Sequence, residues 1–287
     1  CCGWDNNDFL YNMPMCGFAS MQGWQNLMTG GPTGYIQSGG HACTCDSSAG
    51  FDSRLQVHER EKYEWVPSFC FLRQWNATEF CELLGDRNIL IRGDSTAMQS
   101  AATLINMLSN QYKDGKGCQT HISFSYNNLL GALENGRQLQ LVDAIQRTNA
   151  SIVILSGGAH FFDKARYAEH FFLLEKQVVE IRSSQPHVQF AFKTINPGHV
   201  NCQQHTAPID AYLPALNNSG DIYSWNMHPA FDNFARKRAR VLGMPMIEMT
   251  PLYLRPDMHS DCLHACLPGP LDLFAILLQN MLHTKEL

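Results

Sequence analysis

The sequence predicts an α/β protein, in which helices cover both faces of a parallel sheet and a cysteine-rich lobe precedes the sheet. From residue 87 onward, short apolar runs alternate with longer amphipathic stretches. Such repeats are typical of parallel sheets, because each connecting helix crosses over a face of the sheet. Residues 1–86 differ, since Gly, Asn, Ser and Cys dominate there and no long period of 2 or 3.6 emerges. We therefore expect an irregular lobe, residues 1–86, packed on a main domain, residues 87–287.

Five short runs mark the expected strands. “NILIR” is apolar, and the β-branched run in “SIVILS” indicates a buried strand. “THISFSY”, “HVQFAFKTI” and “MPMIEMT” complete the set. The expected strands are residues 88–92, 120–126, 151–156, 187–195 and 244–250.

Each expected strand is followed by a stretch of helical character. “RQLQLVDAIQRT” is amphipathic, and “DKARYAEHFFLLEKQVVEIRSS” is the longest of these stretches. The expected helices are residues 96–110, 137–148, 163–184, 230–243 and 270–282. Ligands bind such sheets at the carboxyl ends of the strands, so residues that directly follow a strand are the first candidates for a site.

Composition narrows the classes of function. The chain of 287 residues is 45% hydrophobic, which suits a globular protein with a substantial core. Its net charge of −5 and pI of about 6.2 give no reason to expect nucleic acid as a partner. The densest basic run, residues 236–240, is expected to be a solvated helix face. No window approaches the ~18 uninterrupted apolar residues of a membrane span, so none is expected.

Eleven cysteines indicate an oxidising compartment, because a cytosolic enzyme of this size rarely carries so many. A zinc site is the rival interpretation, but no paired C-x₂-C motifs are present. The odd count leaves one thiol free, paired outside this sequence, or in an intermolecular disulfide. The disulfide candidates are Cys16, Cys43, Cys45, Cys70, Cys81, Cys118, Cys202, Cys262 and Cys266.

Other features agree with the secretory pathway. Three Asn-x-Ser/Thr sequons make Asn76, Asn149 and Asn217 candidates for glycosylation. The sequence begins at Cys1 without Met, which indicates a processed or trimmed chain. Its last five residues, His-Thr-Lys-Glu-Leu, faintly resemble an ER-retrieval tail. We expect the protein in the Golgi or ER lumen, or outside the cell.

The seam between the first strand and its helix carries “GDS” at residues 93–95. Asp94 or Ser95 could cap the helix, or the triplet could be a tight turn. Alternatively, Ser95 is a nucleophile whose oxyanion is stabilised by the N–H groups and the positive dipole end of that helix. Ser95 lies three residues after the expected strand, where a reactive group belongs, which favours the nucleophile.

A nucleophilic hydroxyl needs a base, and the base needs an orienting group. Residues 260–274, “SDCLHACLPGPLDLF”, lie between the last strand and the last helix, at the same edge of the sheet. In a turn, Asp261 can place its carboxylate against Nδ1 of His264 and leave Nε2 to face Ser95. The structural alternative is an N-cap Asp with an incidental His. A disulfide from either cysteine of this loop would pin it.

Together these motifs resemble SGNH/GDSL-type esterases and acyltransferases, and in detail the PC-esterase family. That family includes plant trichome-birefringence-like proteins and animal neurexophilin-and-PC-esterase-domain proteins. The plant proteins end in a motif close to Asp-Cys-x-His-Trp-Cys-Leu-Pro-Gly, and this chain has “DCLHACLPG” at 261–269. Four further stretches are similar in order and spacing: “YEWVPSFC” (63–70), “SGGAHFF” (156–162), “FKTINPGHVNC” (192–202) and “LYLRPDMHS” (252–260).

The resemblance implies a flavodoxin-like three-layer α/β/α SGNH domain with a Ser95–His264–Asp261 triad and without a metal or cofactor. Ser95 would attack an acyl carbonyl, His264 would move the proton, and Asp261 would orient His264. The expected oxyanion donors are the N–H of Ser95 and groups at Asn127, Asn128, Gly157 and Gly158. The candidates for substrate binding are His160, His199 and Gln99, with a buried structural role as the alternative for both histidines.

The chain departs from the plant pattern at several positions. Gly157 replaces an Asn, and the loss of one oxyanion donor costs on the order of 10²–10³ in rate unless another replaces it. Ala265 replaces the Trp after His264, while Phe161 and Phe162 replace two further tryptophans. We therefore expect a shallower or differently shaped sugar platform. The Arg that follows Gly-Asp-Ser in plant members is also absent.

Three functions follow from these observations. The first is a secretory-pathway O-acyl transferase, with an acyl donor and a glycan or glycoprotein acceptor as partners, that moves an acetyl group through acyl-Ser95. The second is a carbohydrate O-acetylesterase that uses the same triad with water as the acceptor. The third is a catalytically quiet structural or carbohydrate-binding protein, which the lost Arg, Asn and Trp residues favour and the intact Ser, His and Asp oppose.

Overall fold

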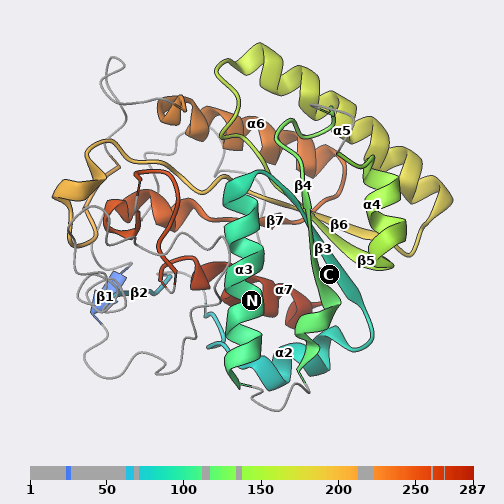
Figure 1. Ribbon diagram of the computed structural model, residues 1–287, viewed down its shortest axis with the longest axis horizontal. Helices are drawn as coiled ribbons and strands as arrows, with labels where there is room; N and C mark the ends of the chain where they lie inside the picture. The colour runs from blue at the N-terminus through green and yellow to red at the C-terminus, as the bar shows by residue number, and fades with distance from the viewer. Residues whose placement is uncertain are drawn as a thin grey trace.

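The computed structural model describes residues 24–26, 63–67, 71–111, 117–133, 138–212, 223–259, 261–267 and 269–287. Its centre is a five-stranded sheet in which all neighbouring strands are parallel, in the order β4-β3-β5-β6-β7 (Figure 1). The strands are β3 (Asn88–Gly93), β4 (Ile122–Tyr126), β5 (Ala150–Leu155), β6 (Gln189–Lys193) and β7 (Met246–Ile247). This is the doubly wound order 2-1-3-4-5, so the expected α/β class is confirmed.

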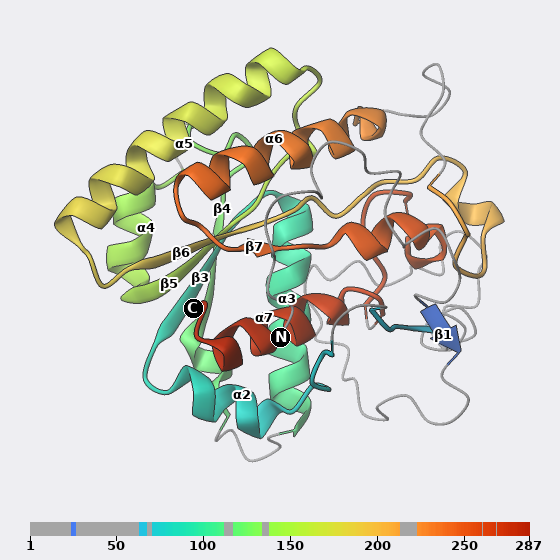
Figure 2. The ribbon, with the colours of Figure 1, turned by 180° about the vertical axis from the view of Figure 1, so that it is seen from behind.

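Helices cover both faces of the sheet. One face carries α2 (Ala77–Leu84), α3 (Ser95–Gln111) and α7 (Asp272–Thr284), and the other carries α4 (Leu141–Thr148), α5 (Lys164–Ser184) and α6 (His228–Val241). The two layers are visible on opposite sides of the strands in Figures 1 and 2. A short antiparallel pair, β1 (Trp24–Asn26) with β2 (Tyr63–Trp65), is separate from the main sheet.

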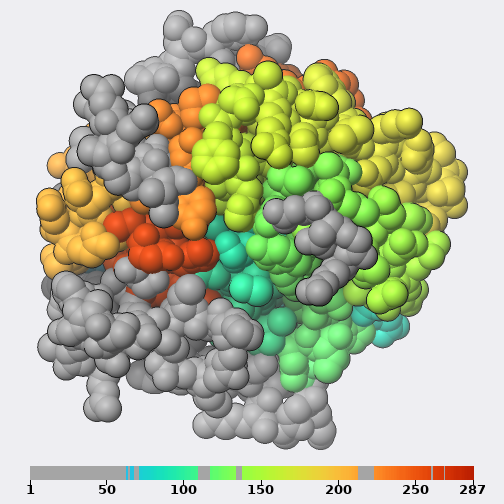
Figure 3. Space-filling model, turned by 45° about the horizontal axis from the view of Figure 1, so that its top comes forward, coloured from blue at the N-terminus to red at the C-terminus, as the bar shows by residue number. Residues whose placement is uncertain are grey.

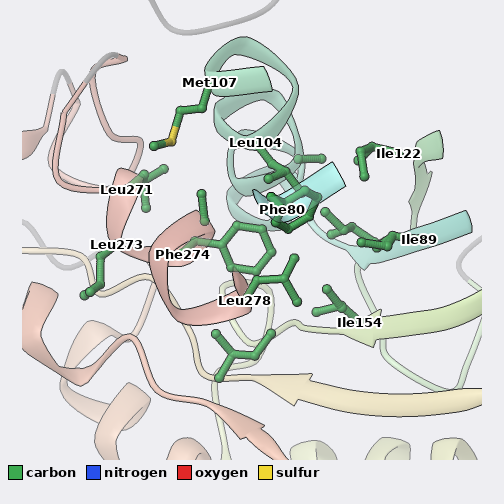
Figure 4. Packing of buried hydrophobic residues seen from close by; sticks show 14 of the residues in the cluster. Phe80, Ile89, Leu104, Met107, Ile122, Ile154, Leu271, Leu273, Phe274 and Leu278 are labelled. Carbon is green, nitrogen blue, oxygen red and sulfur yellow. The ribbon is translucent and has the colours of Figure 1, made fainter. Parts of the chain in front are cut away.

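Alternating side chains of the strands supply two hydrophobic cores. In β3, Ile89 and Ile91 face α3 and α7, whereas Leu90 faces the opposite layer. On the α7 side, Phe274 and Leu278 pack toward the sheet (Figure 4). Because the strands are buried on both faces, they appear in the sequence as continuous apolar runs.

Several expected elements have other bounds in the structure. The expected strand 187–195 is limited to Gln189–Lys193, and residues 120–121, expected in a strand, belong to the 3₁₀ helix Cys118–His121. Residues 77–84, expected to be irregular, form α2, whose N-cap Asn76 accepts the N–H of Glu79 at 3.1 Å. The expected strand 244–250 shrinks to β7, because the 3₁₀ helix Thr250–Leu254 follows with Pro251 in its first turn. Residues 138–140, expected to be helical, precede α4 as non-helical chain.

Two disulfides join candidates from the sequence: Cys81–Cys118, with Cα atoms 5.5 Å apart, and Cys202–Cys262, at 5.2 Å. Cys266 is also disulfide-bonded. Outside the described residues lie Cys16, Cys43, Cys45, Cys70 and Asn217. The other two glycosylation candidates, Asn76 and Asn149, are exposed. None of the helices within the described ranges has the length and apolar character that crossing a membrane requires.

The end of β3 requires a glycine, and this generates a stability prediction. A Cβ on Gly93 would lie 2.4 Å from the backbone oxygen of Ser156 and 2.6 Å from Cβ of Ala97. We predict that Gly93→Ala lowers the free energy of unfolding by roughly 1–3 kcal/mol in urea denaturation. Gly157→Ala is the control, because its Cβ would meet a flexible side chain, with Cδ2 of Leu130 at 3.0 Å. Equal losses in the two variants would contradict this explanation.

Candidate active site

Ser95 is the first residue of α3 and follows the carboxyl end of β3. The preceding residue, Asp94, caps the helix. Its Oδ1 accepts the hydroxyl of Thr96 at 2.7 Å and the backbone N–H groups of Thr96 at 3.0 Å and Ala97 at 3.4 Å. Because Asp94 performs the capping, the Ser95 hydroxyl is not used for it.

The second oxygen of Asp94 ties the loop after β5 to the same point. Oδ2 accepts the N–H groups of Gly158 at 3.2 Å and Ala159 at 3.3 Å, and the carboxylate is fully buried. Burial alone would raise the pKa of Asp94, but the bond from the Thr96 hydroxyl and nearby positive charge hold that pKa below its ordinary value. Asp94 is therefore ionised, and its carboxylate holds the start of α3, where Ser95 lies, against the loop after β5.

Ser95, His264 and Asp261 form one hydrogen-bonded chain. Nδ1 of His264 lies 2.7 Å from Oδ2 of Asp261, and Nε2 lies 2.8 Å from Oγ of Ser95. An ionised carboxylate can only accept, so Nδ1–H donates to Asp261. Nε2 is then the acceptor for the Ser95 hydroxyl in the neutral ring. The two bonds thus link the three expected residues in series, with His264 between Asp261 and Ser95.

The turn around Asp261 explains how the pair is held. Oδ1 of Asp261 accepts the backbone N–H groups of Leu263 at 3.1 Å and His264 at 2.6 Å. One carboxylate therefore fixes both the backbone and the imidazole of His264. This local geometry is what the spacing of three residues predicted.

The contact between Asp261 and His264 shifts the pKa of both side chains. Partial burial would raise the pKa of Asp261, but the hydrogen bonds from the imidazole and backbone of His264 outweigh it and hold that pKa well below its ordinary range. The bond from Asp261 raises the pKa of His264, against a smaller opposing effect of burial. The positive form of His264 is thereby stabilised, as an imidazole that receives a proton requires.

The site lies at the surface. The side chain of His264 is 18% exposed and that of Asp261 is 54% exposed, while Ser95 is partly buried. In Figure 3, teal atoms from around the start of α3 reach the surface between orange-red atoms of the last loops and green atoms of the segment after β4. Solvent and a substrate can therefore approach this edge of the sheet.

Gln99 does not face a substrate, contrary to expectation. It is only 2% exposed, and its amide bonds both backbone groups of Ala265. Nε2–H donates to the Ala265 carbonyl at 2.7 Å, and Oε1 accepts the Ala265 N–H at 3.0 Å. The expectation of substrate binding is wrong because the amide is committed to the backbone next to His264.

His199 takes the buried structural alternative. Its Nε2–H donates to the carbonyl of Tyr253 at 2.8 Å, so its Nδ1 accepts from Nε2–H of His259, 2.7 Å away. Burial lowers the pKa of His199 to about 4, which keeps this ring neutral at physiological pH. Sequence reasoning missed His259, because the pairing joins residues 60 positions apart.

A disulfide joins the loop after β6, which carries His199, to the loop that carries Asp261 and His264. Cys202 is bonded to Cys262, which directly follows Asp261, and the N–H of His199 donates to the Cys262 carbonyl at 2.8 Å. The loop after β6 therefore holds the loop that carries Asp261 and His264. As expected from the sequence, a disulfide pins this loop.

The remaining candidates differ in what they offer. His160 is partly exposed in the loop after β5, and its ring makes a T-shaped contact with the ring of Tyr223 at a centroid distance of 6.3 Å. Of the expected oxyanion donors, Gly158 donates its N–H to Asp94, and Asn127 donates its backbone N–H to Gly93 and its side-chain amide to Ala132. Asn128 is buried beside Asn127. Within the described residues, the N–H groups of Ser95 and Gly157 make no such bond.

Two positions of the expected sugar platform belong to the core. Ala265 is 1% exposed and packs on the α3 side, and Phe161 is fully buried on the opposite side. Phe162, in contrast, is 58% exposed. Ala265 and Phe161 therefore contribute to interior packing, and we correct the expectation that these two positions shape a platform. Across the described part of the chain, no group of three or more His, Cys, Asp or Glu is arranged to hold a metal ion.

No protein-family model and no curated protein matches the chain. Among solved structures, it is similar to a “putative acylhydrolase” from Bacteroides fragilis, with 12% identity and a TM-score of 0.46 over 75% of this chain and 100% of the other. It is also similar to the periplasmic domain of a lipopolysaccharide acetyltransferase from Salmonella ser. Paratyphi A, with 16% identity and a TM-score of 0.42 over 70% and 84% of the two chains. Likenesses this distant carry no argument about activity.

We predict that Asp261→Asn lowers the pKa of His264, because a neutral amide no longer stabilises the imidazolium. An NMR titration of the histidine ring signals measures this pKa, with the other histidines as internal references. In the wild type, the raised pKa means that protonation of His264 favours the folded state. That contribution is complete below the ordinary value of about 6.5 and is lost as the pH rises through the folded-state pKa. An unchanged titration in the variant would refute the coupling.

We also predict that removing the Cys202–Cys262 disulfide disturbs His264, whereas removing Cys81–Cys118 does not. The two bonds close loops with sequence separations of 60 and 37 residues, so chain entropy assigns each a similar stabilisation of about 4 kcal/mol. Double Cys→Ala variants should therefore lose similar stability. A His264 titration shifted equally in both variants would argue against a specific role for the first bond.

Proposed function

We propose that this chain is an O-acyltransferase of the secretory pathway that uses Ser95 as its nucleophile. It passes an acyl group, most simply acetyl, from Ser95 to a glycan hydroxyl. The observation that carries this proposal is the hydrogen-bonded chain from Ser95 through His264 to Asp261 at the carboxyl edge of a doubly wound sheet. The glycan acceptor rests on the resemblance of residues 261–269 and the four other stretches to the PC-esterase family. The disulfides fit an oxidising compartment.

In the first half-reaction, Nε2 of His264 takes the Ser95 proton while Oγ bonds to the acyl carbonyl carbon. The imidazolium that forms is stabilised by Asp261, which keeps its negative charge. The tetrahedral intermediate then collapses, and its bond to the donor's leaving group breaks. His264 gives its proton to that leaving group, so the products are acyl-Ser95 and a neutral His264.

The negative oxygen of the intermediate needs hydrogen-bond donors. The N–H of Ser95 has no carbonyl four residues earlier in α3 and points from the positive end of the helix. The N–H of Gly157 is the second donor that we propose, because the neighbouring N–H of Gly158 is committed to Asp94. In the second half-reaction, His264 takes the proton of a sugar hydroxyl, whose oxygen bonds to the acyl carbon of acyl-Ser95. The bond from that carbon to Oγ of Ser95 then breaks, and His264 returns the proton to Oγ, which restores the free enzyme.

The second candidate function is an O-acetylesterase, and the exposure of the site favours it. Asp261 is 54% exposed, so water can reach the triad. A transferase must offer its acyl-enzyme a sugar hydroxyl faster than water arrives. The two functions therefore differ only in the acceptor of the second half-reaction.

The test is intact-protein mass after mixing with p-nitrophenyl acetate. We predict an adduct of one acetyl group on the wild type and none on Ser95→Ala. Ser100→Ala is a matched control, because Ser100 lies further along α3 and its hydroxyl bonds the Thr96 carbonyl at 3.3 Å. It should form the adduct as the wild type does.

The fate of the acetyl group then separates the two enzymes. Acetylated oligosaccharide in the presence of acceptor supports the transferase, and free acetate alone supports the esterase. If folded wild type forms no adduct and shows no turnover with several esters, the acyl-serine proposal is wrong. The catalytically quiet carbohydrate-binding protein then remains.

A further inference from the structure

We propose that Gln99 is a positioning residue for the general base, because it holds the backbone beside His264 in register with Ser95. The proposal rests on the function proposed above for Ser95 and His264. Gln99 touches no reacting atom and acts through His264. It would therefore be a second functional residue on α3, one turn after the nucleophile.

The geometry gives Gln99 direct control over the peptide that follows His264. Its Oε1 accepts the N–H of Ala265 at 3.0 Å, and that N–H belongs to the peptide bond whose carbonyl is that of His264. Its Nε2–H donates to the carbonyl of the same Ala265 at 2.7 Å. Because Gln99 both donates to and accepts from the backbone of Ala265, the two bonds fix the orientation of Ala265 as well as its distance from α3.

The peptide before His264 is fixed from the other side. Oδ1 of Asp261 accepts the N–H of His264 at 2.6 Å. The peptide planes on both sides of the His264 Cα are thus held by side chains, which sets the direction of its Cβ. Rotation of the imidazole about that direction is limited by the bond to Asp261.

The proposed nucleophile, Ser95, and the positioning residue, Gln99, lie on the same helix, α3. Ser95 and Gln99 are four residues apart on α3, so they lie on the same face of one helix. Gln99 is 2% exposed, which excludes water as a competing partner for its amide. A single turn of helix therefore determines both where Oγ of Ser95 lies and where the backbone of His264 is held.

Gln99→Met keeps the size of the side chain but removes both bonds. We expect kcat with p-nitrophenyl acetate to fall about 10- to 100-fold, because a misplacement near 1 Å can cost about that much in rate. KM should change less than about twofold, since Gln99 makes no contact with a substrate. Formation of acetyl-Ser95 should slow by the same factor as kcat.

Gln99→Glu supplies a pH signature that a merely structural role would not produce. A protonated carboxyl donates and accepts as the amide does, whereas an ionised one repels the Ala265 carbonyl. Burial raises the pKa of the introduced carboxyl above its ordinary value of about 4.3. The ratio of variant to wild-type kcat should therefore be highest at low pH and fall as the pH rises through that raised pKa.

The chain offers a matched control in Gln279 on α7. Gln279 is fully buried and makes the same kind of two-bond clamp, donating to the Gln74 carbonyl at 3.0 Å and accepting the Asn76 N–H at 2.8 Å. Gln279→Met removes an equal pair of bonds from a loop that carries neither Ser95 nor His264. It should lower the melting temperature by a similar amount to Gln99→Met and leave kcat near the wild-type value.

The experiment measures kcat, KM, melting temperature and the NMR signal of the His264 Nδ1–H proton in all four proteins. A kcat loss confined to the Gln99 variants, with a weakened His264 signal, supports the proposal. Wild-type kcat in Gln99→Met, an equal loss in Gln279→Met, or a change in KM alone overturns it. If the wild type itself forms no acyl-Ser95, the proposed function fails, and an unaltered His264 signal in Gln99→Met then overturns the positioning role independently.

Discussion

The buried carboxylate of Asp94 is the constraint on which the rest of the site depends. Moving an ionised carboxylate out of water costs several kcal/mol unless hydrogen bonds replace its hydration. Asp94 obtains them from Thr96 and Ala97 in α3 and from Gly158 and Ala159 after β5. The chain can bury this charge only by bringing the start of α3 and the loop after β5 to one point. Ser95 is thereby placed at that point, beside the end of β3.

A buried cation extends this arrangement to the loop after β6. Lys193 is fully buried, and its Nζ donates to the Thr194 carbonyl and to Oδ1 of Asn196, both at 2.9 Å. Asn196 in turn donates to the Thr96 carbonyl at 3.0 Å. Burial lowers the pKa of Lys193 to about 8, while the charges of Asp94 and Asp232 oppose that shift. The segments that follow β3, β5 and β6 are thus joined through the first turn of α3.

Much of this could be predicted from the sequence where the information is local. The apolar runs identified the strands, and the spacing of Asp261 and His264 predicted their contact because both lie in one turn. Contacts between distant segments could not be predicted in this way. The bonds of Gln99 to Ala265 span 166 residues, and nothing near Gln99 in the sequence distinguishes a clamp from a substrate contact. Helix α2 was missed because the sequence before residue 87 shows no extended periodicity of 3.6.

The same distinction applies to the positions at which the resemblance to the plant proteins led us to expect a sugar platform. Ala265 is buried at 1% exposure, and its backbone meets Gln99, so its side chain packs in the core and cannot extend toward a sugar. A Trp at this position would need a larger space between α3 and the last loop. Phe161 is likewise interior, which leaves Phe162 as the exposed aromatic of that pair. Ala265 and Phe161 therefore belong to the packing that supports the site, and Ser95, His264 and Asp261 form one hydrogen-bonded chain beside it.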